Sequence, residues 1–346
     1  MKDQAFVLRR LVLQSRQRSA ATDASVSCLR LAVACGKGGT GKTTLAINLA
    51  VGLAGRSPEE ADGAGRRVCL LDTAEFAGNA DLMCGAPARQ TLADVLAGDC
   101  WFQDAVLSGP GGISLICGFG SVLRQPRVPN GRQADVWERL RELESNHDVL
   151  VFDCGPGHSP AIRRVLRTVD ALIVVCTPDP AAVAEAYATI KAAAGTRADV
   201  FVVVNQAAAS SHAATIVERL QRTARSFLRR SVGSLDAIPW DAAVRRSTER
   251  GEPLLLSAPT APAAERVRAI CETLRKRYLR RPQSRRSLFD RLRRGETPET
   301  EEASGHDVAA ADAPPTPEAS PAATAPQHAT PDRREQSAAE ESTITV

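Results

Sequence analysis

The chain has 346 residues, of which 43% are hydrophobic and 24% charged, and it carries a formal net charge of +4. This length and hydrophobic content exclude a wholly disordered protein, because they suffice for the core of one large α/β domain or two small ones. The first thirty residues contain no signal-peptide apolar stretch, and no run of about 18 apolar residues occurs. We therefore expect a cytoplasmic protein.

The nine cysteines occur singly, and no Cys-x-x-Cys pair is present. Most of them lie inside apolar runs, so we interpret them as reduced thiols of the core rather than as metal ligands. Their spacing gives no support to a cysteine-ligated metal site.

The chain opens with a charged amphipathic segment at residues 3–14, which we assign to an N-terminal helix over residues 1–16. A linker rich in Ser, Arg and Ala follows over residues 17–28. Residues 29–281 then alternate short runs of Val, Leu and Ile with longer helical stretches. That alternation is typical of a single α/β domain with a mostly parallel, twisted sheet covered by helices on both faces.

The expected strands are residues 31–35, 67–71, 113–117, 148–152, 171–176, 200–204 and 232–238. The clearest expected helices are residues 42–53, 135–143, 180–194, 213–228 and 261–279. Each assignment rests on the length and periodicity of the apolar pattern.

A phosphate-binding loop lies between the first expected strand and the first expected helix, where residues 36–43 fit G-x-x-x-x-G-K-[ST]. Its glycines let backbone N–H groups close around phosphate oxygens, and the helix N-terminus adds partial positive charge. Lys42 would reach the β- and γ-phosphates of ATP, and the Thr43 hydroxyl would ligate Mg²⁺. The candidate nucleotide contacts here are Gly36, Lys37, Gly38, Gly39, Thr40, Gly41, Lys42, Thr43 and Thr44.

Two acidic residues end apolar runs and should meet at the carboxyl edge of the sheet. Asp153 follows the run at residues 149–152, and we assign it to support the metal. Asp72 follows the run at residues 67–71, and we expect it to order Mg²⁺-bound waters or the attacking water. Either carboxylate could instead cap the helix that follows it.

The stretch from Lys37 to Thr43 resembles the deviant Walker A motif of the MinD/ParA ATPases. In that family the early lysine crosses an ATP-dependent dimer interface to the partner's phosphates. A lysine five residues before the P-loop lysine also faces away from its own β- and γ-phosphates. The resemblance implies a P-loop NTPase domain, a homodimer formed on ATP binding, and catalytic roles for Lys37, Lys42 and Asp72.

Within the family, three further stretches look most like the flagellar-number regulators of the FlhG/FleN/YlxH type. Residues 3–9 read D-Q-A-F-V-L-R and are similar to the D-Q-A-x-x-L-R helix that stimulates the partner GTPase FlhF. Residues 153–157 and 177–191 resemble the D-T-G-A-G and T-P-E-P…D-A-Y-x-x-I-K motifs. The resemblance spans residues 1 to about 275.

This resemblance implies particular contacts. The partner-binding residues would be Asp3, Gln4, Ala5, Leu8 and Arg9. The residues around the adenine would include Asn205, Pro239 and Asp241. Two simpler interpretations stay open, because residues 3–9 could be an amphipathic helix covering the sheet edge and Asn205 could cap a strand end.

One position departs from the family pattern. Members usually read D-x-D after the second strand, whereas this chain reads Asp72-Thr73-Ala74. Alanine can neither accept a proton nor orient water, and losing such a group typically costs about 10² to 10⁴ in rate. Glu75 is adjacent, but one residue along an extended segment turns a side chain to the other face. The sequence therefore predicts slow or absent hydrolysis.

After the domain, residues 282–294 are basic and place Leu288, Phe289 and Leu292 on one side of a helix. This segment looks like the membrane-targeting helix of MinD-type proteins, and we expect it to attach the chain reversibly to the anionic inner face of the plasma membrane. A solvated basic linker or a nucleic-acid patch would show the same pattern. Residues 295–346 are acidic, rich in Pro and Ala, and expected to be disordered.

Together these observations predict an ATP-dependent, membrane-recruited switch that regulates flagellar number or placement, with an FlhF-like GTPase and flagellar switch proteins as candidate partners. A DNA-associated partition or division-site ATPase is the alternative. Iron–sulfur relatives fit poorly, since Cys117 and Cys154 are isolated, and tyrosine kinases of this fold need a C-terminal tyrosine cluster, whereas no Tyr follows Tyr278.

Overall fold

The computed structural model describes residues 27–55, 65–75, 78–124, 132–279 and 286–294. The expected N-terminal helix at residues 1–16, most of the linker and the acidic tail at residues 295–346 lie outside the described residues. The proposed partner residues Asp3, Gln4, Ala5, Leu8 and Arg9 lie outside them as well.

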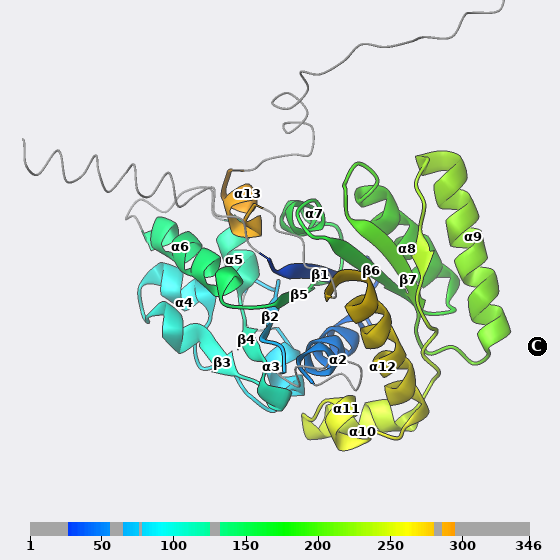
Figure 1. The fold of residues 1–346 in the computed structure, drawn as a ribbon, viewed down its shortest axis with the longest axis horizontal. Coiled ribbons are helices and arrows are strands. Elements are labelled where there is room, and N and C mark those ends of the chain that lie inside the picture. Colours follow the sequence, from blue (N-terminus) through cyan, green and yellow to red (C-terminus); the bar gives the residue numbers. More distant parts are fainter. Residues whose placement is uncertain (1–26, 56–64, 76–77, 125–131, 280–285, 295–346) are drawn as a thin grey trace, which may run out of the picture. The chain divides into compact units, whose positions relative to one another are not determined.

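The described chain folds around one sheet of eight strands in the order β3-β4-β2-β5-β1-β6-β7-β8 (Figure 1). All neighbouring strands are parallel except β3 and β4, which pair antiparallel at one edge. The strands are β1 Leu29–Ala34, β2 Val68–Asp72, β3 Val106–Ser108, β4 Ser114–Ile116, β5 Val149–Asp153, β6 Ala171–Cys176, β7 Asp199–Val204 and β8 Gly233–Ser234. The expected fold class is confirmed.

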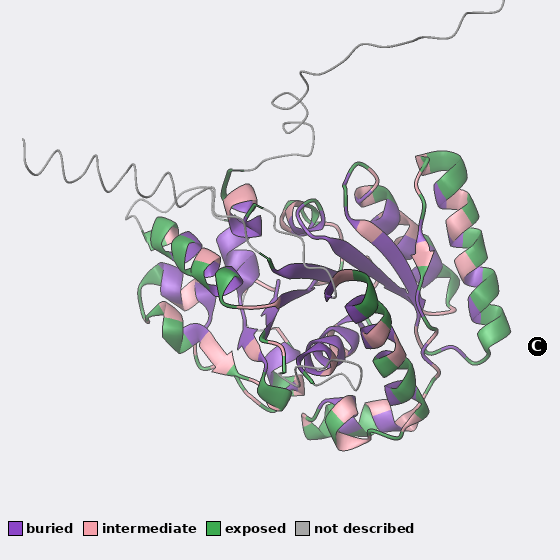
Figure 2. Cartoon of the chain, in the orientation of Figure 1, coloured by how far each residue is buried: buried purple, intermediate pink, exposed green. Residues whose placement is uncertain are grey.

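Two hydrophobic layers cover the sheet because successive side chains of a strand point to opposite faces. In β1, Leu31 and Val33 enter the layer formed with α2 Lys42–Ala54 and α12 Pro262–Leu274, whereas Ala32 and Ala34 enter the opposite layer. Figure 2 shows the central strands buried throughout. A strand buried on both faces reads as an unbroken apolar run, which is why the central strands could be predicted.

The remaining helices flank the sheet. They are α3 Ala80–Met83, α4 Leu92–Ala97, α5 Phe119–Arg124, α6 Arg132–Ser145, α7 Pro160–Leu166, α8 Pro180–Ala192, α9 Ser210–Leu228, α10 Ala242–Arg250, α11 Leu254–Ser257 and α13 Leu288–Arg294, with short turns η1 Phe102–Ala105, η2 Pro110–Gly112 and η3 Arg275–Leu279. The long helices match their predictions, and the missed ones are too short to show a helical period.

The two edges of the sheet differ most from the sequence prediction. The strand expected at residues 232–238 is reduced to the two residues of β8, and β3 was not predicted at all. Edge strands pair on one side only, so short pieces satisfy the sheet there and leave little apolar pattern in the sequence.

Helix α13 carries the three predicted membrane anchors, and in this structure they are buried. Leu288, Phe289 and Leu292 are at most 1% exposed and belong to the hydrophobic layer with Phe119 and Trp137. The Phe289 ring lies 5.8 Å from the Phe119 ring, centroid to centroid, in an edge-to-face arrangement. The apolar side of α13 therefore contacts the domain rather than solvent. Among the described residues, no helix is both long enough and apolar enough to cross a membrane.

Candidate nucleotide site

The loop between β1 and α2 has the backbone of a phosphate cradle. Gly39 and Gly41 adopt left-handed conformations with φ of 76° and 91°, which side-chain-bearing residues rarely adopt. A Cβ atom at Gly41 would also lie 2.2 Å from the amide nitrogen of Asn205. Glycine is therefore required at position 41 by both conformation and space, and it leaves the first N–H groups of α2 facing the loop.

Lys42 and Thr43 begin α2 and reach two different parts of the site. The Lys42 ammonium is almost fully buried and donates to the Lys37 carbonyl at 2.8 Å, so its side chain lies across the mouth of the loop. The Thr43 hydroxyl donates to the Asp153 carboxylate at 2.7 Å. Thr43 and Asp153 thus form the hydroxyl–carboxylate pair that supports Mg²⁺ in P-loop proteins.

Asp72 and Asp153 end the neighbouring strands β2 and β5 in direct register. Burial and, after it, the nearby Asp72 charge raise the pKa of Asp153 to about 7, although the Thr43 hydrogen bond and the Lys42 charge lower it. Burial also raises the pKa of Asp72, while backbone N–H groups of Ala74 and Ala80 oppose the shift. Two buried carboxylates side by side favour a cation between or beside them.

The residues present fit a magnesium nucleotide. Among the described residues, the Asp153 Oδ1 and Thr40 Oγ1 atoms are buried without a hydrogen-bond partner. Such atoms cost free energy unless something satisfies them, and both lie on the phosphate loop or facing it. Thr43 and Asp153, with Asp72 behind them, would hold Mg²⁺ and its waters, and Lys42 with the loop N–H groups would bind the phosphates.

A pocket of about 420 Å³ continues from the loop past α2 to the end of β7. It is lined by Asn205, Pro239, Trp240 and Asp241, which the sequence places 160 or more residues from the loop. The Asn205 amide donates to the Thr40 carbonyl at 2.9 Å. This contact fixes the amide between the phosphate loop and the pocket, where a base can be recognised by its edge.

Asp241 has a structural task that the sequence analysis did not identify. Its Oδ1 accepts from the Ala243 N–H at 2.8 Å and caps α10, and its Oδ2 accepts from the Ala263 N–H at 3.2 Å at the start of α12. Both carboxylate oxygens are therefore engaged with backbone. Asp241 lines the pocket but shapes it mainly by holding these two helices together.

Lys37 points away from its own phosphate loop. Its ammonium forms an ion pair with the carboxylate of Asp179, the residue that caps α8. The Lys37 hydrogen bond, more than any other contact, lowers the pKa of Asp179. Asp179 lies in the predicted motif at residues 177–191, but its contact with Lys37 was not predicted. The one available signal was an acid before Pro180, which marks a helix start at the sheet edge.

Ala74 occupies the position at which the D-x-D sequence pattern predicted a second carboxylate. The Ala74 N–H donates to Asp72 Oδ1 at 2.9 Å, so the backbone of the loop is fixed against the acid that precedes it. Glu75 is ion-paired with Arg124 of α5 and does not replace the missing group. The structure therefore leaves Asp72 and Asp153 as the strand-end carboxylates beside Thr43 and Ala74.

The fold and the site have counterparts among known proteins. Residues 30–198 match the family described as AAA domain, and residues 139–275 match the family described as NUBPL iron-transfer P-loop NTPase. No group of three or more His, Cys, Asp and Glu side chains that could hold a metal is found in the described part of the chain.

Among curated proteins, the antiactivator FleN of Pseudomonas aeruginosa is 28% identical over 246 residues, which is 70% of this chain and 84% of FleN. The flagellum site-determining protein YlxH of Helicobacter pylori is 26% identical over 57% of this chain and 64% of YlxH. The septum site-determining protein MinD of Bacillus subtilis is 28% identical over 45% of this chain and 56% of MinD.

Solved structures agree on the fold. The cell division ATPase MinD of Pyrococcus furiosus superposes with a TM-score of 0.55 at 22% identity, covering 72% of this chain and 99% of that one. A septum site-determining MinD of Pyrococcus horikoshii, complexed with Mg-ADP, gives a TM-score of 0.54 at 23% identity, covering 72% of this chain and 96% of its own. With the phosphate loop, its lysine pair and the strand-end acids, these similarities show that the chain belongs to the ParA/MinD-type P-loop ATPases.

Proposed function

We propose that the chain is an ATP-dependent, dimerising switch that regulates the number or placement of flagella. Its similarity to FleN and YlxH supports the process, since their names describe an antiactivator and a flagellum site-determining protein. The main observation in support of a dimerising switch is that the Lys37 side chain points away from its own loop and pairs with Asp179. A lysine placed there can serve the phosphates of a second copy.

Nucleotide-dependent dimerisation tests this proposal directly. The mass of the purified chain, measured by light scattering with Mg²⁺ and ATP, should be that of a dimer, and with ADP that of a monomer. Lys37→Ala should remain monomeric with ATP. Lys191→Ala removes an exposed lysine from α8 and is the matched control, which should dimerise normally. A wild-type chain that stays monomeric with ATP, or a Lys37→Ala chain that dimerises, would contradict the switch.

An FlhF-like GTPase is the proposed partner, and residues 3–9 are the proposed contact. The proposal rests on the resemblance of this heptapeptide to the activating helix of flagellar-number regulators. GTP hydrolysis by such a partner should accelerate on adding the chain and should not accelerate with the Gln4→Ala/Leu8→Ala variant. An equal stimulation by both chains would assign the activity to another surface.

We also propose that α13 recruits the chain to the membrane, and its burial means that it must first detach from the domain. Because Leu288, Phe289 and Leu292 pack into the domain, α13 must leave its site before these side chains can enter a bilayer. Arg293 and Arg294 are exposed and can meet anionic lipid first. Binding to phosphatidylglycerol-containing vesicles should require ATP and should be lost in Arg293→Glu/Arg294→Glu, with phosphatidylcholine vesicles as the control. ATP-independent binding would contradict recruitment by nucleotide state.

Division-site placement or chromosome partition is the second candidate. It is favoured by the similarity to MinD and by four exposed arginines on and beside α9, namely Arg219, Arg222, Arg225 and Arg229. Retention on duplex DNA that falls steeply with salt would support a DNA-associated role. Charge reversal of Arg222 and Arg225 should abolish that retention, and salt-independent retention would exclude this candidate.

A further inference from the structure

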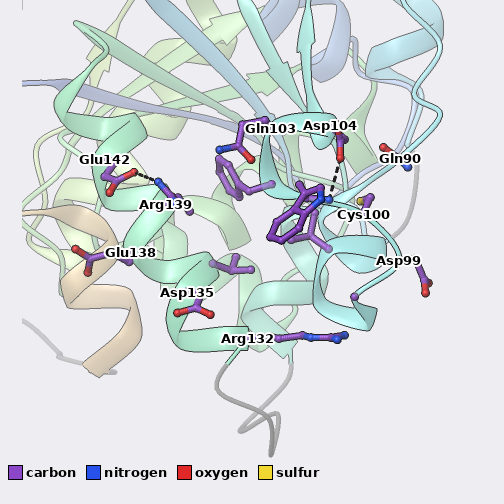
Figure 3. Close-up of a pocket in the computed structure, with 15 residues that line it drawn as sticks. Gln90, Asp99, Cys100, Gln103, Asp104, Arg132, Asp135, Glu138, Arg139 and Glu142 are labelled. Atoms are coloured by element: carbon purple, nitrogen blue, oxygen red, sulfur yellow. Dashed lines mark hydrogen bonds and ion pairs between the residues drawn. The ribbon is translucent and has the colours of Figure 1, made fainter.

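A second groove lies far from the phosphate loop in the sequence, between the α4–η1 connection and α6 (Figure 3). Its volume is about 720 Å³. Val95 and Val136 form part of its buried floor, and Phe102 is partly buried beside them. The Trp101 side chain at its rim is 81% exposed, which is unusual for so large an apolar side chain.

The rim of this groove is acidic. Five carboxylates and two guanidinium groups line it, which gives a net charge of −3. Both cations are engaged, because Arg132 donates to the Ala97 carbonyl at 2.5 Å and Arg139 pairs with Glu142 at 2.8 Å. Figure 3 shows the acids on both walls, with Asp135, Glu138 and Glu142 on α6. An apolar floor with a negative rim fits a basic amphipathic chain segment.

Two of these carboxylates are available to such a segment. Asp99 and Asp135 have no ion-pair partner within the part of the chain that the structure describes. The negative charge around the groove also affects the neighbouring thiol of Cys100. Burial raises the pKa of this thiol most, and Asp94, Asp104 and Asp99 raise it further. A cation placed between Asp99 and Asp135 would relieve this concentration of negative charge.

We propose that the groove binds residues 3–14 of the same chain. That segment has apolar residues Phe6, Leu8 and Leu11 beside the adjacent cations Arg9 and Arg10. The apolar residues match the floor of the groove, and the arginines match its acidic rim. Two copies of the domain would not meet groove to groove, because their acidic rims would repel each other.

Residues 15–26, which connect the segment at residues 3–14 to the domain, are long enough to let it reach the groove. The described chain begins next to the end of α6, since the Leu29 N–H donates to the Asp148 carbonyl at 2.9 Å. Glu142, at one end of the groove, precedes Asp148 by six residues, so at most about 20 Å of extended chain separates them. Residues 15–26 can span up to about 40 Å when extended. The segment can therefore reach the groove without strain on the tether.

Because the segment at residues 3–14 is tethered to the domain, even weak contacts are sufficient to keep it in the groove. A short flexible linker gives an effective concentration of about 1 mM. Even an intrinsic Kd of about 100 μM would then keep the segment docked roughly nine-tenths of the time. Docking would cover residues 3–9, so release from the groove would control access to this heptapeptide; that consequence rests on the proposed function, whereas the docking itself does not.

Hydrogen exchange of the full chain, read by mass spectrometry without nucleotide or partner, tests the docking. Amides of residues 3–14 should exchange roughly tenfold more slowly in the wild type than in Asp99→Arg/Asp135→Arg or in Trp101→Ala. Arg9→Asp/Arg10→Asp should lose the same protection, and combining it with Asp99→Arg/Asp135→Arg should restore it. Glu218→Arg/Glu265→Arg changes two exposed acids on α9 and α12 and is the matched control.

Exchange in the β-strands reports whether each variant is folded, so a variant that fails to fold is recognised and the others decide. Unprotected residues 3–14 in the wild type, or protection unchanged by both groove variants, would overturn the proposal. Protection that appears only at high protein concentration would assign the groove to a second copy and overturn it as well. None of these outcomes depends on ATP, dimerisation or a GTPase, so failure here is distinct from failure of the proposed function.

Discussion

At the scale of single residues, the carboxyl of Asp153 makes the stability of the ligand-free protein depend on pH. In the ligand-free protein its carboxyl is buried beside Asp72, and its pKa lies near 7. In the unfolded chain the same group has a pKa near 3.8. Between these values the folded protein binds a proton that the unfolded chain has lost, so the group favours folding at low pH and loses that effect as the pH rises.

The free energy of unfolding of the ligand-free protein should therefore fall between pH 5 and pH 7, with about 2 kcal/mol of the fall due to Asp153. Asp153→Asn should remove that part of the pH dependence. Urea unfolding in EDTA at pH 5, 6 and 7 measures it, with the exposed Asp236→Asn as the control. Parallel pH profiles for wild type and Asp153→Asn would show that the carboxyl is not perturbed.

The Lys37–Asp179 ion pair opposes dimerisation if Lys37 serves a second copy. Asp179→Asn keeps a side chain that can cap α8 but removes the charge that holds Lys37. The pair is about 40% exposed on both sides, so solvent screens it and it opposes dimerisation only weakly. We expect Asp179→Asn to dimerise with ATP about two- to fivefold more tightly, by analytical ultracentrifugation. Weaker dimerisation would mean that Asp179 contributes to the interface itself.

Ala74 should limit the rate of ATP hydrolysis. Ala74→Asp supplies the second acid of the D-x-D pattern expected from the family resemblance and should raise steady-state phosphate release by at least about 100-fold. Glu75→Ala should leave the wild-type rate unchanged, because Glu75 is paired with Arg124. A wild-type rate that is already high and collapses in Glu75→Ala would show that Glu75 moves into the site.

At the scale of secondary-structure elements, α13 shows why an amphipathic pattern does not identify what covers its apolar side. Residues 288, 289 and 292 would read the same on a membrane helix and on a helix docked to protein. The deciding contacts come from distant sequence. The Glu144 carboxylate pairs with Arg30 at 2.7 Å, and it accepts from the Ser287 hydroxyl and the Leu288 N–H at the start of α13.

Because Phe289 is buried, Phe289→Ala should lower the free energy of unfolding by about 3 to 5 kcal/mol. Arg293→Ala, on the exposed side of the same helix, should change it by less than about 0.5 kcal/mol. Chemical denaturation of both variants measures the difference. Equal and small effects would place α13 away from the domain in solution.

At the scale of the whole molecule, the parts that could be predicted are those whose pattern is local. The run of β1, the glycines of the loop and the acids after β2 and β5 each follow directly in sequence, so the fold class and the loop residues could be predicted. Contacts between distant segments could not. Asp179 meets Lys37 from 142 residues away, and Asp241, which caps the adjacent α10, also accepts from the Ala263 N–H at the start of α12, 22 residues later.

The contacts of the buried Arg30 also link a residue that is synthesised early to a segment that is synthesised late. Arg30 donates to the Arg286 carbonyl, 256 residues later. At about 5 to 20 residues per second, a ribosome needs roughly 13 to 50 s to make the chain between them. The surface of Phe119 and Trp137 that α13 covers stays open on the nascent chain for the later part of that interval, the 152 residues from Trp137 to Phe289, which take roughly 8 to 30 s. The last helix described is therefore the one that ends the period in which this core can aggregate.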